Sequence, residues 1–208
     1  MHVDWLGRMR VVEHFTVADG KIVRLRQIHD TAALRGMTQQ PPSQGDDHRA
    51  SEAGVKAGAT VEQIPDDHGY AAQVVINATR ERVFDALTTV DDLVGWWPTT
   101  VTGSALAGGQ MVLGFAGLDE EIVLRVDIAD RASSVAWTCI SHSALPEWTN
   151  TRMEFSLDAP AEDMTRLAFR HVGLTPSLVC YSDCEGGWNH FLQSVAAYAA
   201  TGKGMPFG

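Results

Sequence analysis

The stretch that decides the fold is Tyr70-Ala-Ala-Gln-Val-Val-Ile-Asn-Ala-Thr-Arg-Glu-Arg-Val-Phe-Asp-Ala-Leu87. In its first half Ala72, Val74 and Ile76 alternate with other side chains, which is typical of a β-strand with one buried face. In its second half the apolar residues fall at helical spacing, and Thr79 is placed to cap the helix. The stretch therefore predicts a strand that passes directly into a helix.

The chain after this stretch reads as a short helix, a run of strands and a long final helix. Pro98 ends the short helix, which carries the adjacent indoles Trp96 and Trp97. Apolar residues recur at helical spacing from Trp188 to Ala199, and Gly202 supplies the stop. Alternation of apolar and polar residues predicts antiparallel strands with one face exposed to solvent. The strands are expected at residues 110–115, 121–129, 134–141, 149–157 and 164–172. The fold class is therefore α+β, a curved antiparallel sheet wrapped around a long C-terminal helix.

The first seventy residues read differently from the rest of the chain. Residues 11–17 and 21–28 are β-prone runs joined through Asp19-Gly20, a strong hairpin signal. We predict a β-hairpin appendage within residues 1–40, a flexible linker over 41–69 rich in Pro, Gly and Asp, and a domain over 70–208. A lone hairpin is marginal in water, so we expect it to recruit a sheet edge, with a homodimer as one way to do so.

Composition excludes several classes of protein. The 208 residues hold 16 Lys+Arg and 26 Asp+Glu, a net charge of −10, which leaves no basic footprint for nucleic acid or an anionic membrane. No window reaches the roughly 18 apolar residues of a membrane span, and the start lacks a secretory h-region. We therefore expect a cytoplasmic protein whose cysteines, Cys139, Cys180 and Cys184, are reduced.

The residues from Tyr70 onward resemble a known family. The matching pieces are residues 76–87, Trp96-Trp97-Pro98, Gly108-Gly109, Val135-Ala-Trp137, residues 165–174, Gly187-Trp188 and residues 198–206. They are similar to the START-like (SRPBCC) superfamily, in the branch named for the activator of heat-shock-protein-90 ATPase homologue. The resemblance implies the helix-grip fold. A superfold hosts many activities, so the resemblance says less about function. Residues 12–30 resemble the final strands of SnoaL-like domains, and because the sequence holds no more of such a domain, we carry over no catalytic residue from it.

The predicted domain offers a ligand cavity between the concave sheet and the final helix. Small-molecule sites are mostly apolar with few polar anchors. Here His171 and Tyr181 are the polar candidates. The candidate ligand-binding residues are Trp96, Trp97, Phe115, Trp137, Phe155, Phe169, His171, Tyr181 and Trp188. Each aromatic residue has core packing as an equal alternative, and a satisfied core histidine is the stronger interpretation of His171.

Other chemistry has little support in the sequence. No Ser-His-Asp order, nucleophile elbow, phosphate loop or paired-carboxylate motif is present, so we predict no catalytic residue, metal or cofactor. Cys180 and Cys184 lie one helical turn apart, yet packing explains them better than metal or redox chemistry.

Three functions stay open at this point. The first is a non-enzymatic or weakly enzymatic module that binds a small apolar ligand. The second is a protein-interaction domain with a filled core, contacting a chaperone or regulatory protein. The third is a cyclase or dehydratase, for which His171 and Tyr181 are the nominated polar groups.

Overall fold

The computed structural model describes residues 11–18, 21–29 and 59–207. The chain divides into two compact units, residues 1–54 and 55–208. In the first unit, β1 (Val11–Ala18) and β2 (Lys21–His29) pair antiparallel from Val11 with His29 to Ala18 with Lys21. The predicted hairpin is therefore present. Residues 41–58 of the predicted linker lie outside the described residues.

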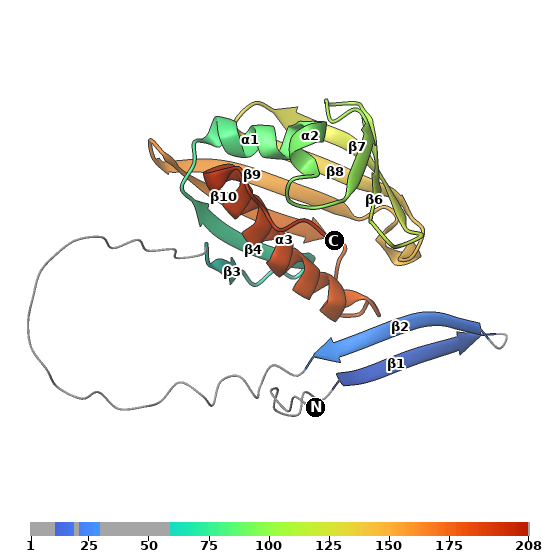
Figure 1. Cartoon of the computed structure of the whole chain (residues 1–208). Coiled ribbons are helices and arrows are strands. Elements are labelled where there is room, and N and C mark those ends of the chain that lie inside the picture. The colour runs from blue at the N-terminus through green and yellow to red at the C-terminus, as the bar shows by residue number, and fades with distance from the viewer. Residues whose placement is uncertain (1–10, 19–20, 30–58, 208) are drawn as a thin grey trace, which may run out of the picture. The chain divides into compact units, whose positions relative to one another are not determined.

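The second unit is an eight-stranded antiparallel sheet with helices packed on it. The strands lie in the order β3-β4-β10-β9-β8-β7-β6-β5. Figure 1 shows the long helix α3 lying across the sheet with α1 and α2 beside it. The elements are β3 (Val61–Gln63), β4 (Gly69–Ile76), α1 (Arg80–Thr88), α2 (Val90–Leu93), β5 (Thr100–Gly103), β6 (Gln110–Gly114), β7 (Glu121–Asp130), β8 (Ser134–His142), the 3-10 turn Pro146–Trp148, β9 (Arg152–Ala161), β10 (Met164–Val172) and α3 (Tyr181–Thr201). The predicted α+β helix-grip architecture is confirmed.

The structure differs from the sequence prediction at the ends of the sheet. Strand β3 lies inside the segment 41–69 that was assigned to the linker, and it pairs with β4 from Val61 opposite Val74 to Gln63 opposite Ala72. Strand β5 was not predicted at all. Both edge strands have only three or four residues. Such short runs show no period, so their pairing depends on the open edge of the neighbouring strand.

The core forms where inward side chains of adjacent strands meet. Phe155 of β9 lies opposite Phe169 of β10 and opposite Val135 of β8, and all three are buried. A β-bulge interrupts the alternation of β7, because Val126 pairs with Trp137 while Ile128 pairs with Ala136. Ile128, which strict alternation would place on the buried face with Val126, is therefore only partly buried.

The helices are tied to one another by buried hydrogen bonds. The Thr79 hydroxyl accepts from the Arg82 amide and caps α1 as predicted. The Trp96 indole donates to the Ala86 carbonyl oxygen at 2.8 Å, and the Ser194 hydroxyl of α3 donates to the Trp96 carbonyl oxygen at 2.7 Å. These bonds hold the segment after α2 between α1 and α3.

The C-terminal tail folds back onto the same segment. Gly202 adopts a left-handed conformation, φ 76°, and ends α3. The Met205 amide then donates to the Ser194 hydroxyl, and the Phe207 amide donates to the Trp97 carbonyl oxygen at 3.0 Å. The tail therefore places the Phe207 ring beside the segment that carries Trp97.

A chain of buried hydrogen bonds crosses the core at His171. The Trp188 indole donates to His171 Nδ1 at 2.9 Å, so this nitrogen carries no proton. The Thr151 hydroxyl donates to the Trp148 carbonyl oxygen, which leaves its lone pairs to accept from His171 Nε2 at 2.9 Å. His171 is thus a neutral and fully satisfied core histidine, and burial lowers its pKa to about 3.

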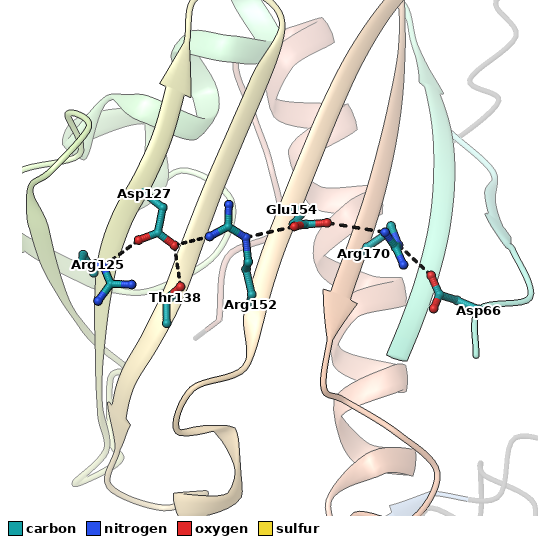
Figure 2. A network of polar contacts seen from close by, with 7 residues as sticks. All are labelled: Asp66, Arg125, Asp127, Thr138, Arg152, Glu154 and Arg170. Atoms are coloured by element: carbon teal, nitrogen blue, oxygen red, sulfur yellow. Dashed lines mark hydrogen bonds and ion pairs between the residues drawn. The ribbon is translucent and has the colours of Figure 1, made fainter. Parts of the chain in front are cut away.

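The solvent face of the sheet carries a ladder of alternating charges (Figure 2). Arg152 lies at its centre, with Nη1 2.6 Å from Asp127 Oδ2 and Nε 3.0 Å from Glu154 Oε1. Arg170 extends the ladder from Glu154 to Asp66 in the turn before β4. The ladder therefore joins β7, β9 and β10 to that turn.

We predict that His171 makes the fold sensitive to acid. The unfolded chain takes up a proton near the ordinary histidine pKa of about 6.5, whereas the folded chain does not until about pH 3. Stability should fall as pH drops through that window, by up to about 1.4 kcal/mol per pH unit. Urea unfolding of the wild type and of His171→Gln between about pH 4 and pH 7 measures this. The stability gap between the two should narrow toward acid, and a constant gap would contradict the prediction.

We predict that Arg152 is the most stabilising member of the ladder. Its side chain is 31% exposed and has two carboxylate partners, so Arg152→Met should cost about 1 kcal/mol at low salt. The loss should shrink in about 0.5 M NaCl because salt screens the pairs. Arg131→Met is the matched control, since that side chain is 71% exposed and lies 3.9 Å from Asp85. Equal effects of the two substitutions in urea unfolding would contradict the prediction.

Candidate functional site

A pocket of about 290 Å³ opens at one end of the sheet. Its wall comes from the ends of β7 and β8, the first half of α3, the segment after α2 and the C-terminal tail. Aromatic and aliphatic side chains dominate this wall. The lining residues are Trp97, Phe115, Leu118, Glu120, Ile122, His142, Leu145, Trp148, Asp183, Cys184, Gly187, Trp188, Phe191 and Phe207.

Local structure explains why this end of the sheet stays open. Helix α3 contributes Cys184, Gly187, Trp188 and Phe191 from one face, and Gly187 has no side chain to fill the space in front of it. The Phe207 ring meets Phe115 edge to face, with centroids 5.4 Å apart. The tail thereby forms one side of the pocket entrance.

The polar feature of the pocket is a pair formed by His142 and Glu120. The Leu145 amide donates to His142 Nδ1 at 3.2 Å, which leaves the proton on Nε2. That nitrogen lies 3.3 Å from Glu120 Oε1. Burial lowers the pKa of His142 to about 4 and raises the pKa of the Glu120 carboxyl above its usual value. At neutral pH a neutral imidazole therefore faces the carboxyl group of Glu120.

The structure brings only some of the predicted ligand-binding residues to this pocket. Trp97, Phe115 and Trp188 line it. Tyr181 lies elsewhere, on a separate and more polar groove of about 480 Å³ between α3 and the turn before β4. The remaining candidates are buried side chains that do not line the pocket: Trp96, Trp137, Phe155, Phe169 and His171. Ligand contact by any of these residues stays a prediction.

The buried aromatic residues fill the space where the sequence suggested a roomy cleft. The Trp97 and Trp137 rings stack with centroids 5.7 Å apart at 10°. Further ring contacts follow: the centroids lie 4.7 Å apart for Trp137 and Phe155, 4.9 Å for Phe155 and Phe169, and 4.4 Å for Phe169 and Trp188. We call these five rings the aromatic ladder. The aromatic ladder fills the middle of the space between the sheet and α3, so the pocket is confined to one end of the sheet.

Sequence reasoning missed Glu120, His142, Trp148, Phe191 and Phe207. A second β-bulge explains His142: Leu124 pairs with Cys139 while Val123 pairs with Ser141. The bulge shifts the alternation of β8 by one residue, so His142 is buried and Ser141, which strict alternation from Cys139 would bury, is exposed. The helical spacing from Trp188 could have found Phe191. Trp148 and Phe207 lie in a short turn and a tail, where periodicity carries no signal.

The cysteines of α3 are packed thiols. Cys184 Sγ accepts from the Trp148 indole at 3.3 Å, and the Cys180 amide donates to the Glu147 carboxylate at 2.8 Å. Burial is the first cause that raises the pKa of both thiols. A raised pKa keeps a thiol protonated and unreactive, in agreement with the packing interpretation. In the described part of the chain, no three His, Cys, Asp or Glu side chains group as a metal site.

Over the described residues, no helix combines the length and the hydropathy that a membrane crossing needs.

Several solved structures are similar to this chain. The Aha1 dimer from Colwellia psychrerythraea is 25% identical, with a TM-score of 0.56, and the match covers 64% of this chain and 97% of that one. DynU16, from the dynemicin biosynthetic locus, is 20% identical with a TM-score of 0.54, covering 67% and 49%. PFC0360w, an HSP90 activator from Plasmodium falciparum, is 15% identical with a TM-score of 0.51, and the match covers 62% of this chain and 93% of that one. The last two likenesses show the fold alone.

The sequence comparison identifies the family. No curated protein sequence matches the chain at a significant level. Residues 77–200, more than half of the chain, match the profile described as "Activator of Hsp90 ATPase homolog 1-like protein". The match begins directly after β4 and spans α1, the aromatic ladder and the pocket-lining face of α3. The chain therefore belongs to the family of Activator of Hsp90 ATPase homolog 1-like proteins.

Proposed function

We propose that this protein is a binding module for a small apolar ligand held in the pocket at the end of the sheet. The observation that carries the proposal is the pocket itself, about 290 Å³ of space with apolar walls and one polar pair. Small-molecule sites combine these features. The volume is near the lower limit for such sites, so it suits a compact ligand of up to three rings.

The pocket wall favours ligand binding over an interaction domain with a filled core. Trp97 and Trp188 are 2% exposed and form a rigid base, while Phe207 is 39% exposed at the entrance. A ligand there removes further aromatic surface from water, at about 25 cal/mol per Å². The Glu120 and His142 pair offers a hydrogen-bonding point that fixes the orientation of the ligand.

Two other functions have less support. The family name and the Plasmodium falciparum activator favour a chaperone as protein partner, and the dimeric Colwellia psychrerythraea relative favours self-association. Neither function explains an open pocket. The polar groups that the sequence nominated for a cyclase or dehydratase are His171 and Tyr181, and neither of them lines the pocket. Both alternatives therefore rank below ligand binding.

We predict that the full chain binds N-phenyl-1-naphthylamine, a neutral fluorescent probe, in a saturable one-to-one complex. The expected Kd is on the order of 1–100 μM, because a small pocket limits the affinity of a small ligand. Gly187→Leu should abolish binding, since the new side chain grows from the pocket wall. Fluorescence titration of the wild type and the variant measures this.

The matched control is Gly186→Leu. Gly186 precedes Gly187 on α3 but does not line the pocket, and an added Cβ meets nothing within 4 Å. Both substitutions replace a helix glycine and should raise helix stability by up to about 1 kcal/mol. Loss of binding only in Gly187→Leu supports the pocket. Equal binding by both variants, or no binding by the wild type, would contradict the proposed function.

A further inference from the structure

The charges around the pocket are all of one sign. No Lys or Arg is among its lining residues, whereas Glu120 and Asp183 both are. His142 adds no positive charge at neutral pH, because burial lowers its pKa to about 4. The chain as a whole carries −10. A ligand in this pocket therefore meets a negative potential at close range and another at long range.

Glu120 is placed to act on a ligand. Its side chain is 21% exposed, and its ion-pair partner among the described residues is the neutral imidazole of His142 at 3.3 Å. A contact with a neutral imidazole does not neutralise a carboxylate. Burial without a neutralising partner is unfavourable for an ionised carboxyl group. A positive group entering the pocket would supply the missing counter-charge.

The rest of the wall is built from aromatic rings. Six rings besides His142 line the pocket, on elements far apart in the sequence: Trp97, Phe115, Trp148, Trp188, Phe191 and Phe207. The rings pack closely, with centroids 5.3 Å apart for Trp97 and Trp188 and 6.2 Å apart for Trp148 and Trp188. Aromatic faces attract ammonium groups, most strongly where water is excluded.

We propose that the ligand of this pocket is an organic cation, an aryl or alkyl ammonium compound whose positive group lies against Glu120 and the aromatic wall. The inference rests on the proposed binding function and names the chemical class of its ligand. An anionic ligand such as a carboxylate meets the opposite conditions, since the pocket offers no basic side chain. A neutral ligand fills the volume but leaves the Glu120 charge unmatched.

The test compares two probes of the same shape and different charge. Benzyltrimethylammonium and neopentylbenzene differ only in the central atom of their end group, a positive nitrogen or a neutral carbon. Each displaces N-phenyl-1-naphthylamine from the full chain in a competition titration. We expect the cation to bind about tenfold more tightly than the neutral compound, as a desolvated cation–π contact and a nearby carboxylate together allow.

Variants assign the preference to the pocket. Glu120→Gln keeps the size of the side chain and removes one charge, so it should weaken cation binding about tenfold and bring the ratio of the two probe affinities close to one. Glu162→Gln removes the same charge from the exposed turn between β9 and β10, away from the pocket, and should change neither. Phe207→Leu removes an aromatic ring at a partly exposed position of the wall but keeps an apolar side chain there. It should therefore weaken binding of the cation more than binding of the neutral probe.

The outcomes separate the two proposals. If both probes displace the dye with equal affinity, or neopentylbenzene is the tighter, the cation inference is overturned while the binding function stands. An equal loss of cation affinity in Glu120→Gln and Glu162→Gln would also overturn it, because the effect would then be one of net charge. If neither the dye nor either probe binds, as judged also by direct quenching of tryptophan fluorescence, both proposals are overturned.

Discussion

The packing of α3 onto the sheet through the aromatic ladder is the constraint on which the rest of this structure depends. Trp188 contacts the ladder at Phe169 and donates its indole proton to His171, so one residue joins the helix to β10 by both apolar and polar contacts. A large ring with a satisfied N–H can hold such a position without leaving a buried donor unpaired. The ladder fills the middle of the grip, which leaves space only at the end where β7 and β8 diverge from the helix.

The sequence predicted the elements that repeat and missed those that depend on tertiary contacts. Alternation placed β7 to β10, and helical spacing placed α3, because each is long enough to show its period. It failed at the bulges near Asp127 and Ile140, where one extra residue exchanges the two faces of a strand. The polar half of the pocket lies after such a shift. His142 was therefore out of reach of pattern reasoning, although Trp97, Phe115 and Trp188 were found.

His171 and His142 show how much the surroundings of a histidine decide its role. Both are buried and neutral, and both accept a hydrogen bond at Nδ1. His171 Nε2 donates a hydrogen bond to the Thr151 hydroxyl inside the core, whereas His142 Nε2 lies 3.3 Å from a carboxylate on the pocket wall. Sequence reasoning named the first as a candidate polar anchor of a ligand site, with a satisfied core histidine as the stronger interpretation. The second has the geometry for that role, because its partner Glu120 also lines the open space.

The tail after α3 has a consequence for how the protein is handled at the bench. Its backbone is bound to Trp97 and its Phe207 ring forms part of the pocket wall, so the carboxyl-terminal residues belong to the site. An affinity tag joined after Gly208 begins two residues beyond Phe207 in the sequence. Purification handles and fusion partners are therefore better placed at the amino terminus, and binding data from C-terminally tagged protein describe a modified site.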